Sequence, residues 1–164
     1  MKDGEADVDA FIKYSLSVQN RRKSRMGYSL QNHLSAVFDA CQVRYDPQVI
    51  TENGKKPDFI FPGKAEYENV LFSTHLLTML AAKSSCKDRW SQILPEAVRI
   101  DMKHLVTLEP AISESQTNTM RQANVQLIVP GRIRESYTDN QQGWLWSLGD
   151  FLELVLERQA SANN

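Results

Sequence analysis

Short apolar runs that alternate with segments of helical periodicity constrain the fold of this chain more than any other feature. HLVTL (104–108) and VQLIV (125–129) are rich in Val, Leu and Ile and suit buried strands. DFIF (58–61) favours a third strand, and the stretch 76–83, ambiguous by itself, is assigned to a central strand. This alternation predicts an α/β fold with a mixed central β-sheet flanked by helices.

The spacing of the remaining apolar residues predicts the helices between and around these strands. Helices are expected over 8–20, from Ser29 as N-cap, over roughly 66–75, after Asp88, from the SESQ capping box at 113, and over 140–158. The pair Asn53-Gly54 predicts a turn between a strand near 43–45 and DFIF. We therefore expect a hairpin that carries Asp58.

Length and composition favour one domain. The chain has 164 residues, of which 41% are hydrophobic, and this is enough for one continuous core. We expect a single domain over 1–164, with residues 1–20 as an N-terminal helical arm. No apolar run approaches the roughly 20 residues of a bilayer span, and the charged start MKDGEAD does not resemble a secretory signal. Cytoplasmic localisation without membrane contact is the expectation.

The basic residues are unevenly distributed. A net charge of −1 does not predict a nucleic-acid partner, because DNA binding depends on where Lys and Arg gather. Arg22, Lys23 and Arg25 fall within RRKSR, and a second basic group surrounds Lys87. These clusters are compatible with one basic face. A solvated helix end is the alternative interpretation of RRKSR.

Two acids and a lysine form the candidate catalytic constellation. Asp58 lies at the predicted hairpin strand, Lys83 near the end of the next strand, and Glu96 on the predicted helix beyond it. Phosphodiester hydrolysis needs a hard cation, an activated water and compensation of growing negative charge. Asp58 and Glu96 are the expected Mg²⁺ ligands, and Lys83 would orient the water. Tyr67 is a further catalytic candidate, with a half-buried packing residue as the alternative.

Four strings identify a family. RRKSRMGYSL, KPDFIFPG followed by Tyr67, LTMLAAKSSCKDRW and LVTLEPAISESQ resemble the C-terminal nuclease domain of EcoRII-type restriction enzymes over nearly the whole chain. The resemblance implies a PD-(D/E)XK, restriction-endonuclease-like core, Mg²⁺ dependence, and cleavage of duplex DNA at a CCWGG-like site. It also matches Asp58 and Lys83 to the motif's acid and lysine, and Glu96 to a relocated second carboxylate.

The triplet Lys87, Asp88 and Arg89 resembles the element that reads CC and GG doublets in this family. Lys and Arg can donate to guanine O6 and N7, and a carboxylate can accept from cytosine N4. Without the family, Asp88 as a helix cap between surface charges is the simpler interpretation. The basic residues of RRKSR, namely Arg22, Lys23 and Arg25, are expected to contact DNA phosphates.

The chain also departs from the family. Gln31 and Ser35 stand where related enzymes often carry an acid, which predicts impaired or altered use of a second metal ion. A CCWGG-like site favours a homodimer. The resemblance further implies a nucleoid-associated protein with a functionally paired cytosine methyltransferase in the host.

Two other functions stay open. One is a monomeric repair endonuclease that nicks DNA at mismatches. The other is a catalytically weakened module that binds a specific DNA sequence. Asp58, Lys83 and Glu96 together argue against a pure binder, which needs no metal-binding carboxylates.

Overall fold

A five-stranded mixed sheet forms the centre of the molecule. The computed structural model describes residues 26–164, so the predicted helix over 8–20 and the basic residues Arg22, Lys23 and Arg25 lie outside the described residues. The strands follow the order β1 (Asp46–Pro47), β2 (Phe59–Phe61), β3 (Thr78–Lys83), β4 (Lys103–Thr107) and β5 (Val125–Ile128). β1, β2 and β3 pair antiparallel, whereas β3, β4 and β5 pair parallel. The predicted α/β class with a mixed sheet is confirmed.

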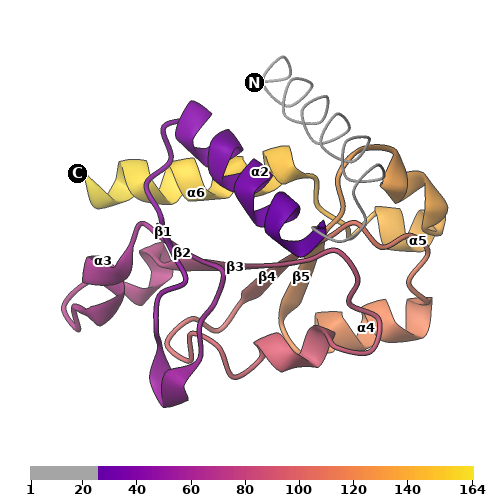
Figure 1. The fold of residues 1–164 in the computed structure, drawn as a ribbon, viewed down its shortest axis with the longest axis horizontal. Coiled ribbons are helices and arrows are strands. Elements are labelled where there is room, and N and C mark those ends of the chain that lie inside the picture. The colour runs from indigo at the N-terminus through magenta and orange to yellow at the C-terminus, as the bar shows by residue number, and fades with distance from the viewer. Residues whose placement is uncertain (1–25) are drawn as a thin grey trace.

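Helices cover both faces of the sheet (Figure 1). α2 (Met26–Ala40) and α6 (Leu148–Ala162) pack on one face, and α4 (Glu114–Gln122) lies on the other. Strand alternation divides the core, because successive side chains point to opposite faces. Phe59 and Phe61 therefore join the α2/α6 side, while Ile60 joins the other. This burial of both faces explains why β2 is a continuous apolar run.

The strands predicted over 58–61, 76–83, 104–108 and 125–129 are confirmed with small changes in their bounds, whereas the strand predicted at 43–45 was wrong. The strand expected at 43–45 is instead the two-residue β1, which pairs with β2 as the second arm of a hairpin. Asn53 and Gly54 have φ angles of 60° and 70° in the connecting turn. These are left-handed conformations that Asn and Gly adopt more readily than other residues. The hairpin places Asp58 directly before β2.

Two helix predictions near the N-terminal half were wrong in part. Ser29 lies inside α2 and does not cap it, although the predicted apolar stripe of this helix is buried. The helix expected over 66–75 is split into α3 (Lys64–Glu68) and the 3₁₀ turn η3 (Thr74–Leu76). Val70 and Leu71, part of the supposed apolar face, are 88% and 91% exposed. Their exposure leaves a longer helix without the packing that would stabilise it.

The single helix predicted over 140–158 is two helices. α5 (Asp139–Gln142) ends at Gly143, and α6 starts after Ser147. Each begins with a capping box. The N-cap hydroxyl accepts a hydrogen bond from the backbone N–H of the third helical residue, and the side chain of that residue accepts one from the backbone N–H of the N-cap. Between them Trp146 forms a parallel bridge with Ile128 of β5. A strand-like segment at the sheet edge thus interrupts the helical pattern.

The helix expected after Asp88 is also absent. Residues Trp90–Ile93 form the 3₁₀ turn η4, and Glu96 follows in a bend. Pro95 has no backbone N–H to continue a helix, and Ala97 has a φ of 47°. A further 3₁₀ turn, η5, spans Gly131–Ser136. Among the described residues, no helix is both long and apolar enough to cross a bilayer.

Candidate active site

The side chain of Asp58 is fixed by three hydrogen bonds. Its Oδ2 accepts from the backbone N–H of Ala82 at 2.7 Å. Its Oδ1 accepts from Nε2 of Gln31 at 2.9 Å and from Nε2 of Gln48 at 3.1 Å. The bond to Ala82 ties the acid beside β2 to the residue before Lys83 on β3. The hairpin therefore brings the predicted acid beside the predicted lysine.

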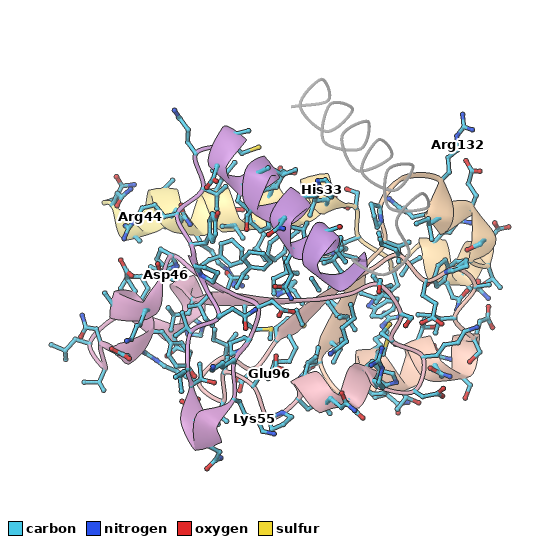
Figure 2. All side chains as sticks on the ribbon, viewed as in Figure 1. His33, Arg44, Asp46, Lys55, Glu96 and Arg132 are labelled. Carbon is cyan, nitrogen blue, oxygen red and sulfur yellow. The ribbon has the colours of Figure 1, made fainter. Side chains whose placement is uncertain are left out.

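Glu96 approaches the same place from the connection between β3 and β4. The charges of Asp58 and Lys83 both act on its carboxyl group, as does that of Lys55 in the hairpin turn. Figure 2 shows Glu96 and Lys55 on the same side of the sheet, below β2 and β3 in that view. Three residues that are far apart in sequence, Asp58, Lys83 and Glu96, thus form one electrostatic cluster.

The pKa values of both acids in this cluster are raised. Burial, followed by the negative charge of Asp58, raises the pKa of Glu96 to about 7, although Lys83 and Lys103 oppose the rise. Burial also raises the pKa of Asp58, against the hydrogen bond from Ala82 and the charge of Lys83. A cation between the two carboxylates would remove this mutual repulsion.

The donor chemistry fits a hard divalent cation. Oε2 of Glu96 is buried and has no hydrogen-bond partner among the described residues, which is costly for a carboxylate unless a cation or another donor reaches it. Within residues 26–164, no three His, Cys, Asp or Glu side chains gather into a metal-binding group. Asp58 and Glu96 are therefore the two candidate ligands. Mg²⁺ commonly uses one or two carboxylates and fills its other positions with water and phosphate.

Gln31 on α2 lies within this cluster. Besides bonding Asp58, it accepts from Nε2 of Gln48 at 3.3 Å. The amide thus occupies the position from which an acid at residue 31 would face Asp58 directly. Ser35, one helical turn further, uses its backbone oxygen to accept from the hydroxyl of Tyr45 at 3.4 Å.

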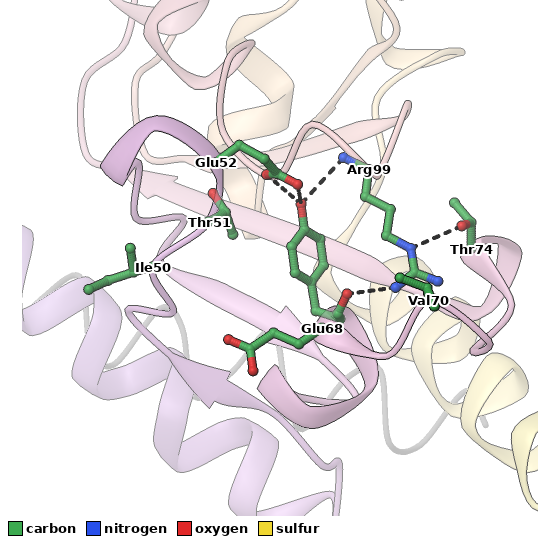
Figure 3. Close-up of a pocket in the computed structure, with 8 residues that line it drawn as sticks. Ile50, Thr51, Glu52, Glu68, Val70, Thr74 and Arg99 are labelled. Carbon is green, nitrogen blue, oxygen red and sulfur yellow. Dashed lines mark hydrogen bonds between the residues drawn. The ribbon is translucent and has the colours of Figure 1, made fainter.

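The hydroxyl of Tyr67 is hydrogen-bonded to Glu52 and to the backbone of Arg99. Its hydroxyl lies 2.7 Å from Oε2 and 2.9 Å from Oε1 of Glu52, to which it donates, and it accepts from the backbone N–H of Arg99 at 3.3 Å (Figure 3). The ring is buried and borders an open pocket of about 450 Å³. These contacts give Tyr67 a supporting position, and its predicted catalytic role stays a prediction.

The triplet Lys87, Asp88 and Arg89 is exposed. The turn η4 has Arg89 at its N-cap position and no side-chain capping bond. The interpretation of Asp88 as a helix cap is therefore wrong. Arg89 makes long contacts of 3.4 Å, from its guanidinium to the backbone and hydroxyl oxygens of Ser85. The side chains of the triplet are accessible to a partner in solution.

Two residues at the ends of β4 were not identified from the sequence. Oε2 of Glu109 accepts from the backbone N–H groups of Cys86 and Lys87, at 2.6 and 2.9 Å, and so fixes the start of the triplet. The ammonium group of Lys103, which is 5% exposed, contacts the backbone near Glu96. The sequence offered one signal for Lys103, namely a lysine at the start of a strand that is otherwise suited to burial. A buried ammonium group there requires acceptors from within the protein.

Comparison with known proteins gives consistent results. The sequence profile of the family described as EcoRII C terminal matches residues 1–152. The type II restriction enzyme EcoRII of Escherichia coli is 43% identical over 153 residues, which is 93% of this chain and 38% of that enzyme. The type II restriction enzyme SsoII of Shigella sonnei is 24% identical over 163 residues, covering 92% of this chain and 52% of that enzyme.

Solved structures support the same fold. Metal-depleted Ecl18kI in complex with uncleaved, modified DNA matches with a TM-score of 0.74 and 25% identity, over 91% of this chain and 50% of that one. A second complex of metal-depleted Ecl18kI with uncleaved DNA matches with a TM-score of 0.72 and 24% identity. The predicted restriction-endonuclease-like core is confirmed. The chain spans about half or less of the length of these relatives, and it belongs to the EcoRII C-terminal family.

Proposed function

We propose that this chain is the catalytic domain of a type II restriction endonuclease, which hydrolyses phosphodiester bonds of duplex DNA at a CCWGG-like site with Mg²⁺. The convergence of Asp58, Lys83 and Glu96 carries the proposal, since the charges of the first two act on Glu96, whose buried oxygen lacks a partner in the described part of the chain. Membership of a family whose relatives are named type II restriction enzymes supports the same activity.

In this mechanism Asp58 and Glu96 would hold Mg²⁺, which would supply Lewis-acid stabilisation of the phosphate when bound. Lys83 donates a hydrogen bond to the attacking water, and its positive charge compensates the charge that grows on the phosphoryl oxygens. The bond from Ala82 to Asp58 keeps the acid and the lysine in one geometry. The water oxygen then forms a bond to phosphorus while the bond to the leaving deoxyribose oxygen breaks, and a proton from the water ends on that leaving oxygen.

The exposed triplet is the proposed base-reading element. Lys87 and Arg89 donate to guanines in the major groove, and Asp88 accepts from a cytosine amino group. Arg22, Lys23 and Arg25 remain proposed phosphate contacts. A homodimer with one active site for each strand suits a nearly palindromic target. A paired cytosine methyltransferase, which would protect host DNA in a nucleoid-associated setting, completes the proposal.

Plasmid digestion tests this function. A plasmid with CCWGG sites should be cut into discrete fragments with Mg²⁺ and left intact with EDTA. Lys83→Ala should abolish the fragments, whereas Lys64→Ala, a change at an exposed lysine in a surface ion pair, should not. Fragments that persist in Lys83→Ala would contradict the mechanism, and nicked circles alone would favour the monomeric mismatch-nicking endonuclease.

One observation favours a second candidate, a catalytically weakened DNA-binding module. Gln31 places an amide on Asp58 where an acid is expected. A neutral amide attracts a cation less than a carboxylate does. Tight binding to a CCWGG duplex in EDTA, with no cleavage at any Mg²⁺ concentration, would support this module and contradict the enzyme.

A further inference from the structure

We propose that Lys103, Thr51 and Glu52 are positioning residues that clamp the Glu96 segment (residues 96–100) through its carbonyl and N–H groups and so aim the Glu96 carboxylate at the cluster. The proposal deepens the proposed function and rests on it for the role of Glu96. The segment carries the proposed metal ligand Glu96, but it belongs to neither a helix nor a strand that would hold it.

Lys103 holds the segment through its carbonyl groups. Its Nζ donates to the backbone oxygens of Glu96, Ala97 and Ile100, at 2.7, 2.8 and 2.5 Å. An ammonium group has three N–H donors, and all three are used. The side chain is buried at the start of β4, so the rigid parallel part of the sheet anchors the segment.

A second set of bonds holds the segment through its backbone N–H groups. Ala97 donates to Oγ1 of Thr51 at 3.1 Å, and Val98 donates to Oε2 of Glu52 at 3.2 Å. The next N–H, that of Arg99, donates to the hydroxyl of Tyr67, which itself donates to Glu52. Figure 3 shows Thr51 and Glu52 among the residues that line the pocket. Three consecutive donors therefore meet side chains of the β1–β2 hairpin connection and α3.

These contacts replace the bonds that a helix would supply. Ala97 lies in the left-handed region with a φ of 47° and is fully buried, a conformation that costs about 1 kcal/mol for a residue with a Cβ. External bonds must therefore hold it. Because Thr51 and Glu52 belong to the same hairpin that delivers Asp58, the clamp fixes Glu96 relative to Asp58 and not only relative to the core.

Two variants test the clamp. Lys103→Met removes the three donors at similar volume. Thr51→Ala, at a half-buried position, removes the acceptor for Ala97 together with the hydroxyl's bond to the backbone oxygen of Lys55. Their matched controls are Lys64→Met and Thr119→Ala, which change an exposed lysine and an exposed hydroxyl bonded to the backbone of Ser115. Hydrogen exchange of the peptide covering 94–102 and the kcat and KM for cleavage are measured for each folded protein.

We expect exchange in this peptide to accelerate about 5-fold or more in Thr51→Ala, the effect of losing one hydrogen bond. kcat should fall about 10- to 100-fold, as for other residues that orient metal ligands, with KM for DNA unchanged. The controls should match the wild type. Unchanged exchange in Thr51→Ala, or faster exchange with unchanged kcat, overturns the clamp.

The proposed function and the clamp fail separately. A wild-type protein that never cleaves DNA contradicts the proposed function, while hydrogen exchange still decides whether Thr51 and Lys103 hold the segment. A wild-type protein that cleaves with Mg²⁺ and needs Glu96, but whose kcat is insensitive to Thr51→Ala and Lys103→Met, overturns the clamp alone.

Discussion

Two parts of the connection between β3 and β4 are held very differently. The Glu96 segment has three of its carbonyl groups and three of its N–H groups bound to side chains. The triplet Lys87–Arg89 is exposed. The carboxylate of Glu109 binds it through the backbone N–H of Lys87 and leaves the side chain of Lys87 exposed. One stretch of chain therefore contains both a fixed and a projecting element.

The difference matches what each part is proposed to do. A metal ligand has to stay within about half an ångström of its productive position, so it needs surrounding bonds. Base-reading side chains must instead reach into a groove and adjust to DNA, and they form their bonds only with the partner. The comparison predicts that changes at the two parts affect separate quantities: metal use and rate in the first, and sequence preference in the second.

Glu96→Gln gives the largest expected effect. Cleavage should fall at least about 1,000-fold through the loss of a metal ligand. The pKa of Glu96 is raised to about 7 by burial and by Asp58, so its stabilising contribution is present below its unfolded pKa and lost as pH rises through 7. Melting in EDTA should therefore show the variant more stable than wild type at pH 8 but not at pH 4. Equal melting at both pH values would contradict the electrostatics.

Asp88→Ala should act on recognition alone. We expect about a 10- to 100-fold loss of preference for the CC/GG doublet, the value of one base contact. Because the residue is exposed, the melting temperature and the Mg²⁺ concentration for half-maximal cleavage should stay at wild-type values. Competition binding with substituted duplexes measures the preference. A changed Mg²⁺ requirement would break the division between the two parts.

Glu109→Gln tests the link between the two parts. It keeps one oxygen acceptor but loses the charge that strengthens the bonds to Cys86 and Lys87. We expect specific DNA binding to weaken about 10-fold, corresponding to about 1.4 kcal/mol, with little change in hydrogen exchange of residues 96–100. Fluorescence anisotropy with Ca²⁺ in place of Mg²⁺ measures the binding. Accelerated exchange at 96–100 would show that the parts are coupled.

Gln31→Glu should have a smaller effect of opposite sign. An acid beside Asp58 adds negative charge to the cluster, which destabilises the metal-free protein and favours a cation. We expect the Mg²⁺ concentration for half-maximal cleavage to fall a few-fold and the melting temperature in EDTA to drop at pH 8. Asn32→Asp, which adds the same charge at the next, exposed position of α2, is the matched control. An unchanged Mg²⁺ concentration for half-maximal cleavage would show that residue 31 does not influence metal binding.

Sequence patterns predicted β2 to β5 well because most of their residues are buried. Almost any local alternative would expose the Phe, Val or Ile side chains of β2, β4 and β5. Helix bounds were less predictable. Gly143–Ser147 interrupts a pattern that continues on either side, because Trp146 gains a bridge to β5 that no local preference reveals.

The sequence indicated those residues of the candidate site whose side chains are themselves proposed to take part in the reaction. Asp58, Lys83 and Glu96 were predicted from residue type and family strings, and the charges of the first two act on the third. Lys103 and Glu109 were missed because their roles depend on backbone groups distant in sequence. Tertiary contacts of this kind leave no spacing pattern, although a lysine within a β-branched run gives a hint.

β3 and β4 run parallel, so the chain between them must cross over the sheet, and residues 84–102 form that crossover. The proposed base-reading triplet and the proposed metal ligand Glu96 are thus inherited as one uninterrupted stretch. A recombination event or a designed graft that exchanges this stretch would transfer target preference together with part of the catalytic apparatus. Its success would depend on whether the recipient retains the equivalents of Lys103 and Glu109 at the two ends of β4.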